Sequence, residues 1–197
     1  FDAKLTSPFE PRWNFMVDRL AETGDAMAKA GLATAKAVRQ PVKTEEDIGA
    51  AFDADLSYVK GSAVLRMFES WVGEARFRDF IRAYLAQHAW GNATTEDFLA
   101  SMREHLSPEG ADAFRTFIEQ PGVPSLSAEV RCDGAPRVVV SQHRYQPLGQ
   151  KLADETWKIP VCLRTDAGRT CSLVTSARAE VPLSACPKWV ELNAGGV

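Results

Sequence analysis

The sequence predicts an α+β multidomain chain in two parts, a helical region followed by a small antiparallel β-sandwich. In the first part, apolar residues recur at steps of three and four, as they do along one face of a helix. After Ser125 this period changes to alternation and to short apolar runs that turns separate. The segment Pro121-Gly122-Val123-Pro124 lies between the two parts and ends the helical pattern. We therefore expect a helical domain of residues 1–122 and a β domain of residues 123–197.

Composition and charge narrow the class of protein. Of the 197 residues, 45% are hydrophobic, which is enough for ordinary globular cores. The net charge of -3 leaves no basic stripe, so we expect no nucleic-acid partner. No apolar run approaches the roughly 18 residues that a membrane-spanning helix needs, so we expect no membrane-spanning segment.

The N-terminal stretch predicts helix as far as Pro41. From Pro11 to Val38 the chain is rich in alanine and carries apolar residues at helical spacing, with Gly24 and Gly31 as interruptions. Two helices and one kinked helix are equally consistent with this pattern.

An acidic stretch runs from Lys43 to Asp55 and predicts a short helix and a loop. Carboxylates near a helix N-terminus are stabilised by the helix dipole, so a solvated structural role explains these residues. We assign no metal ligand among them.

A central amphipathic helix of about four turns is predicted within residues 56–72. Ser57 precedes it as the expected N-cap, and Gly73 follows it as the expected stop. Its apolar stripe consists of Val64, Leu65, Phe68, Trp71 and Val72.

Three further helices are predicted before the β region. The first covers residues 77–88, and the second is capped by Thr94 or Thr95 with acidic residues in its first turn. The third begins at Ser107 and Pro108, because proline is well tolerated at the first helical position.

The β region predicts short strands separated by turns at residues 133–136, 147–149 and 166–168. The expected strands lie within residues 125–132, 137–146, 155–163, 169–176, 179–183 and 188–192. This pattern is typical of a small antiparallel sandwich.

All four cysteines lie in the β region and contain no C-x-x-C pair, which argues against a zinc ribbon. They are either four buried thiols of a cytosolic protein or two disulfides. Cys162 and Cys171 flank a hairpin-like segment that would bring their sulfurs together, which leaves Cys132 to pair with Cys186. The even count in one small region favours disulfides, and with them an extracytoplasmic location, periplasmic or secreted.

The start of the central helix carries Tyr58, Lys60 and Gly61 in the pattern Y-x-K-G. A tyrosine at a helix start is usually a half-buried residue with a solvated hydroxyl. Gly61 disfavours helix by about 1 kcal/mol relative to alanine, which suggests that another backbone or a ligand comes close at this turn.

The Y-x-K-G pattern is followed in order by an L-R-M helix, G-E-x-x-F, Y-L-x-x-H, a small-residue turn with Asn-Ala, and an acidic D-F helix. In this order, residues 57–102 closely resemble the zinc aminopeptidases of the alanyl (membrane) aminopeptidase type, a branch of the gluzincin metallopeptidases. Weaker similarity extends over most of the chain. The resemblance implies the helical half of a thermolysin-like catalytic domain followed by a β-sandwich domain.

The resemblance also implies an activity, the zinc-dependent release of N-terminal residues from peptides. Tyr58 would donate a hydrogen bond to the oxyanion, as the one catalytic residue of this chain. The H-E-x-x-H motif, the third zinc ligand and the G-x-M-E-N motif of the family are absent, and His88, His105 and His143 include no i, i+4 pair. We therefore expect a C-terminal fragment that lacks the upstream catalytic segment, binds no zinc itself and is inactive alone.

His88 lies on the apolar face of its predicted helix. Because no partner stands at metal-ligand spacing, we interpret it as a core or helix-end residue and not as a ligand.

A non-catalytic scaffold or protein-interaction module is the alternative function. An H-E-x-x-H motif upstream in the same gene would exclude it. We favour the enzyme, because a protein without a metal has no evident physical reason to carry Y-x-K-G.

Overall fold

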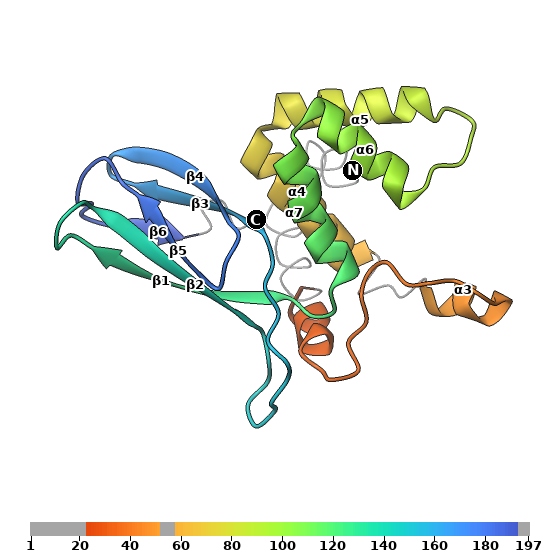
Figure 1. The fold of residues 1–197 in the computed structure, drawn as a ribbon, viewed down its shortest axis with the longest axis horizontal. Helices are drawn as coiled ribbons and strands as arrows, with labels where there is room; N and C mark the ends of the chain where they lie inside the picture. Colours follow the sequence, from red (N-terminus) through yellow and green to blue (C-terminus); the bar gives the residue numbers. More distant parts are fainter. Residues whose placement is uncertain (1–22, 52–57, 193–197) are drawn as a thin grey trace, which may run out of the picture.

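The computed structural model describes residues 23–51 and 58–192. A helical part and a β part lie side by side, as Figure 1 shows. Ser57, the expected cap of the central helix, and the apolar positions before Thr23 lie outside the described residues.

The first described helix ends earlier than the sequence predicted. Residues 23–30 are helical, and the N–H of Gly31 closes the last turn by donating to the carbonyl of Met27 at 3.0 Å. The prediction of helix as far as Val38 is wrong, because the chain turns at Gly31. A Cβ on Gly31 would lie 2.9 Å from Pro147 Cδ and 3.0 Å from a ring carbon of Tyr145, so the helix ends where a loop of the β part contacts it.

The acidic stretch forms the short helix α3, Glu45–Ala51, as predicted, and it lies at the edge of the helical part (Figure 1). The Asp47 carboxylate accepts hydrogen bonds from the backbone N–H groups of Lys43 and Thr44, both at 2.9 Å. These donors hold the pKa of Asp47 below its usual value. The acidic first turn thus stabilises the start of its own helix.

The central helix α4 spans Gly61–Val72, and a π-type turn at Tyr58–Lys60 precedes it. It ends at Gly73, whose φ of 91° lies in the left-handed region and whose N–H donates to the carbonyl of Glu69 at 2.8 Å. The predicted stop at Gly73 is therefore confirmed.

Three helices follow in the predicted order, α5 at Glu74–Gln87, α6 at Thr95–His105 and α7 at Pro108–Glu119. Thr94 caps α6 in a reciprocal capping box with Asp97. The Ser107 hydroxyl caps α7 by accepting from the N–H of Gly110 at 2.9 Å.

The core of the helical part is aromatic. Phe68 of α4 is fully buried and lies edge-on against Phe114 and Phe117 of α7. Phe98 of α6 contacts both Phe80 of α5 and Phe114. These contacts connect α4 to α7 through one cluster of rings, and they bury the apolar stripe that the helical spacing predicted.

As far as Leu192, the last residue described, the β part consists of two three-stranded antiparallel sheets. One sheet has the order β1-β2-β5, with bounds Pro124–Arg131, Arg137–Arg144 and Arg178–Pro182. The other has the order β4-β3-β6, with bounds Gly168–Val174, Ile159–Thr165 and Val190–Leu192. Six strands were predicted, and all six lie where the sequence placed them.

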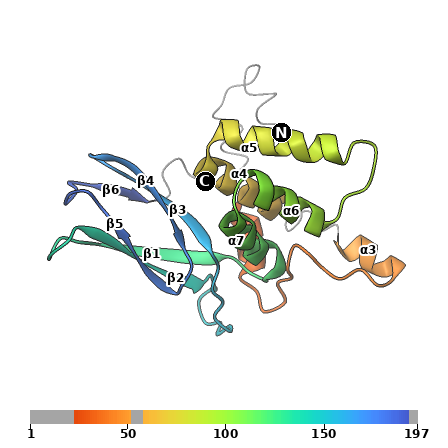
Figure 2. The same cartoon turned by 45° about the horizontal axis from the view of Figure 1, so that its top comes forward.

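The two sheets stack face to face beside the helices (Figures 1 and 2). Trp157, Leu163 and Val138 are fully buried in the β part. The chain changes from helix to strand between the end of α7 and Pro124. A division into separate domains at residues 122 and 123 stays a prediction.

Hydrogen bonds connect the helical part to the β part. The Arg169 guanidinium of β4 donates to the carbonyl oxygen and the hydroxyl of Ser70 in α4, at 2.8 and 3.1 Å. The backbone N–H of Lys158 donates to the Thr116 hydroxyl of α7 at 3.2 Å. The sheet β4-β3-β6 thus packs against α4 and α7.

Two disulfides lie in the β part, with the pairing that the sequence suggested. Cys162 and Cys171 are directly opposite each other in the β3–β4 hairpin, with their Cα atoms 4.1 Å apart. Cys132 follows β1 and is joined to Cys186, with their Cα atoms 5.7 Å apart. Among the described helices, none is long and apolar enough to cross a bilayer.

Candidate functional site

Tyr58 lies in the turn that leads into α4, and the residue is 65% exposed. No hydrogen bond joins its phenol to another residue in the described part of the chain. The structure therefore does not bury this tyrosine in the core, and its O–H remains free to donate to a bound molecule.

Lys60, in contrast to Tyr58, is buried, with only 7% of the residue exposed. Its Nζ donates to the carbonyl oxygen of Gly122 at 2.8 Å and to that of Gln120 at 3.3 Å. Burial, and secondarily the positive charge of Arg144, lowers the pKa of Lys60 to about 8.

The helical geometry of the turn explains this division. Residues two apart on a helical turn point to opposite sides, so Tyr58 and Lys60 cannot share one environment. The Ser62 hydroxyl donates to the carbonyl of Val59 at 3.0 Å and satisfies one acceptor of the same turn. With Lys60 directed into the protein, the phenol of Tyr58 is directed outward.

A cavity of about 600 Å³ lies beside this turn. Its lining is mainly apolar and comes from three places: residues 23–36, the start of α4, and the junction of α7 with β1. Val59 and Lys60 contribute to it, and so do Phe117 and Val123. Sequence reasoning missed both this cavity and the burial of Lys60. The sequence signal that could have indicated the buried lysine is a single lysine close to Val59 and Val64 at the start of an amphipathic helix.

The described residues do not fit a zinc site. They contain no group of three or more histidine, cysteine, aspartate or glutamate side chains that could hold a metal ion. His88 is the C-cap residue of α5 and packs against the ring of Tyr84 at 5.1 Å, which agrees with its interpretation as a helix-end residue. His143 lies on the surface, with Nδ1 3.7 Å from an Asp154 carboxylate oxygen.

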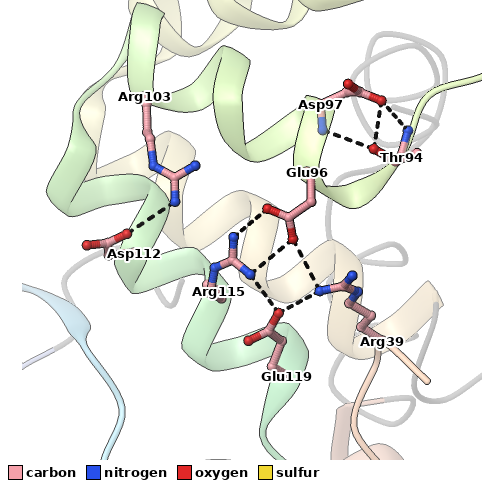
Figure 3. A network of polar contacts seen from close by, with 8 residues as sticks. All are labelled: Arg39, Thr94, Glu96, Asp97, Arg103, Asp112, Arg115 and Glu119. Atoms are coloured by element: carbon pink, nitrogen blue, oxygen red, sulfur yellow. Dashed lines mark hydrogen bonds and ion pairs between the residues drawn. The ribbon is translucent and has the colours of Figure 1, made fainter. Parts of the chain in front are cut away.

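A network of paired charges joins Arg39 to α6 and α7 (Figure 3). Arg115 donates to Glu96 at 2.7 Å and to Glu119 at 2.9 Å. Arg39 donates to Glu119 at 2.7 Å and reaches Glu96 at 3.3 Å.

This network has a structural role. The hydrogen bond from Arg115 holds the pKa of Glu96 below its usual value. Each carboxylate already has two cationic partners, and the four side chains are between 29% and 53% exposed. The network therefore connects the segment around Arg39 to α6 and α7, and it does not resemble an acid–base pair of an active site.

Comparison with known proteins identifies the family. Residues 1–119 match the Peptidase family M1 domain. Aminopeptidase 2, mitochondrial, of Saccharomyces cerevisiae is 28% identical over 189 residues, which are 94% of this chain and 20% of the yeast protein. Probable M1 family aminopeptidase 1 of Encephalitozoon cuniculi is 35% identical over 135 residues, which are 68% of this chain and 15% of that protein. The chain spans about a fifth or less of the length of these relatives.

A solved structure supports the fold. The crystal structure of Legionella pneumophila aminopeptidase A in complex with aspartic acid matches with a TM-score of 0.58 and 18% identity, over 79% of this chain and 18% of that chain. This likeness shows that the α+β arrangement of helices followed by antiparallel sheets is shared. The family match over residues 1–119 includes Tyr58, Lys60 and helices α3 to α7. The resemblance that Y-x-K-G and the following helices indicated is confirmed, and the chain belongs to peptidase family M1.

Proposed function

We propose that this chain is a C-terminal part of a zinc-dependent aminopeptidase that releases N-terminal residues from peptides, and that Tyr58 stabilises the oxyanion. The observation that carries the proposal is the exposed phenol of Tyr58, which has no hydrogen-bond partner among the described residues. It stands at the start of a helix whose other face is buried in an aromatic core. A rigid support of this kind suits a donor that must meet a reacting atom.

The chemistry follows from the position of the phenol. When a nucleophile attacks the scissile carbonyl of a peptide, negative charge develops on the carbonyl oxygen. A phenol O–H aimed at that oxygen donates a hydrogen bond that strengthens in the transition state. Such a donor raises kcat more than it tightens substrate binding.

The described residues do not fit a zinc ion, and we assign none of them as the general base. In the proposal the ion and the base come from a segment of the parent enzyme outside the 197 residues. Zinc there would polarise the scissile carbonyl and activate the attacking water. We expect the 197-residue chain by itself to hydrolyse no aminoacyl reporter substrate.

The two disulfides support an extracytoplasmic location for the parent enzyme. Disulfides persist in oxidising compartments and are rare in the cytosol. Peptide mapping of the protein isolated from its native host, with free thiols blocked at lysis, tests this. Free thiols at Cys162 and Cys171 would remove the support for this location.

Replacement of Tyr58 by phenylalanine in the complete enzyme tests the catalytic proposal. The substitution keeps the ring and removes the donor, so kcat should fall by about a hundredfold to a thousandfold while KM changes little. Tyr84→Phe is the matched control, because the Tyr84 ring packs against Phe98 inside the helical part. The control should retain nearly normal kcat.

The opposite result would assign Tyr58 a structural role. If Tyr58→Phe retained more than about a tenth of the wild-type kcat, the loss would be too small for an oxyanion donor. A lowered melting temperature with normal turnover of the folded enzyme would lead to the same conclusion. The chain would then be better described as a scaffold.

A further inference from the structure

The amine of Lys60 is enclosed by backbone from a distant part of the chain. Its two acceptors, the carbonyl oxygens of Gln120 and Gly122, belong to the end of α7 and to the loop that leads into β1. Gln120 is the C-cap residue of α7. A cation beside the last carbonyls of a helix is favourably placed, because the helix dipole is negative there.

The acceptor loop is itself fixed. Gly122 has φ of 83°, in the left-handed region. A Cβ at this position would lie 2.8 Å from the Arg144 guanidinium, which is contributed by β2. The carbonyl that receives the shorter Lys60 hydrogen bond therefore belongs to backbone that α7 and β2 hold in place.

Tyr58 and Lys60 lie in one turn, with Tyr58 exposed and Lys60 buried. Rotation of this turn about its axis would move both side chains together. The hydrogen bonds of Lys60 oppose such a rotation, because the amine would leave both carbonyls. We propose that Lys60 is a positioning residue for Tyr58: its hydrogen bonds to the end of α7 fix the direction in which the phenol points.

This inference rests on the proposed role of Tyr58. Lys60 does not itself meet a substrate in this arrangement, since it is buried and its amine already has two acceptors. Its burial also has a cost, which the lowered pKa reflects. An apolar residue would avoid that cost but would leave the carbonyls of Gln120 and Gly122 without their donor, so these hydrogen bonds explain the lysine better than packing does.

A double-mutant cycle in the complete enzyme tests the inference. Lys60→Met keeps the aliphatic stem and removes the donors. In the wild-type background it should lower kcat by about tenfold to a hundredfold and leave KM within about twofold, as expected when a reacting group is displaced by about 1 Å. In the Tyr58→Phe background the same change should alter kcat by less than about twofold, because the donor that Lys60 orients is already gone.

Arg76→Met is the matched control. The Arg76 guanidinium of α5 donates to the carbonyl of Leu106, the C-cap residue of α6, so it makes the same kind of contact away from Tyr58. We expect Arg76→Met to lower the melting temperature and to leave kcat of the folded enzyme unchanged. Lys60→Gln, which retains a donor, is made in parallel and should fall between wild type and Lys60→Met.

Two outcomes would overturn the inference. One is an equal loss of kcat from Lys60→Met in both backgrounds. The other is a Lys60→Gln enzyme that folds and is as inactive as Lys60→Met. The proposed function would be contradicted by a different result, a normal kcat of the Tyr58→Phe single variant. The four enzymes of the cycle thus distinguish a wrong role for Lys60 from a wrong role for Tyr58.

Discussion

The side-chain amide of Gln142 and the backbone of Trp157 exchange two hydrogen bonds inside the β part. Gln142 Nε2 donates to the Trp157 carbonyl and its Oε1 accepts from the Trp157 N–H, both at 2.9 Å. The same Nε2 donates to the carbonyl of Ser176 at 2.9 Å. Gln142 is 1% exposed. These hydrogen bonds satisfy its amide, which allows a polar side chain to be buried beside valines.

Gln142→Leu should therefore destabilise the protein strongly. The change leaves the buried N–H and carbonyl of Trp157 and the partly buried carbonyl of Ser176 without their partner, which we expect to lower the free energy of unfolding by about 3 kcal/mol. Urea denaturation followed by circular dichroism measures this. Gln87→Leu, at an exposed position at the end of α5, is the control and should change stability by less than about 0.5 kcal/mol. Equal effects of the two changes would contradict the role given to Gln142.

Lys60 predicts a pH dependence of stability. Its pKa is about 8 in the folded protein and has an ordinary value of 10.5, so the unfolded chain binds more protons between these values. The free energy of unfolding therefore rises with pH from about 8 to 10.5, by on the order of 3 kcal/mol from this group.

The comparison of wild type with Lys60→Met isolates this contribution, because the other titrating groups are common to both. Urea denaturation at several pH values across the window should show the difference in stability changing in favour of wild type as pH rises. A difference that is constant with pH would mean that Lys60 is as well solvated as in the unfolded chain.

Ser107 should contribute to stability as a helix cap. Ser107→Ala removes the acceptor for the Gly110 N–H, which we expect to lower the free energy of unfolding by about 1 kcal/mol. Ser107→Thr keeps the hydroxyl oxygen and should restore most of this loss. Thermal unfolding of the three proteins measures both effects, and an alanine variant as stable as wild type would show that water replaces the cap.

The two disulfides should contribute unequally. Cys132 and Cys186 are 54 residues apart and Cys162 and Cys171 are 9 apart. In the chain-entropy picture, replacing each pair by serines should lower the free energy of unfolding by about 4 and about 2.5 kcal/mol, respectively. Denaturant titration of the two double variants tests the order, and a larger loss from the Cys162–Cys171 pair would contradict it.

Local signals were enough to predict most of the fold. The caps at Thr94 and Ser107 depend on residues within three positions of the helix start, and the sequence displays them directly. The six strands were predictable from alternation and turns, because the core takes every second side chain. The pair Cys162 and Cys171 followed from a two-strand hairpin in which the partners are close in sequence.

Features that depend on distant contacts were not predictable. The helix that ends at Gly31 does so against Pro147, which lies far away in sequence. The burial of Lys60 depends on where the loop at Gly122 comes to lie. Tyr58 could be selected from the motif, yet only the structure shows that its phenol is exposed and without a partner among the described residues.

The position of β2 between β1 and β5 has a consequence for how fast the chain folds. Strand β1 pairs with β2 through a short turn, so Val130 and Val138 can meet early. Strand β5 reaches β2 only after a long intervening segment has been brought back, and Val138 must then find Val181. The Cys132–Cys186 bond joins a residue before β2 to a residue after β5 and so keeps the two strands near each other. The oxidised chain should therefore refold faster than the reduced chain.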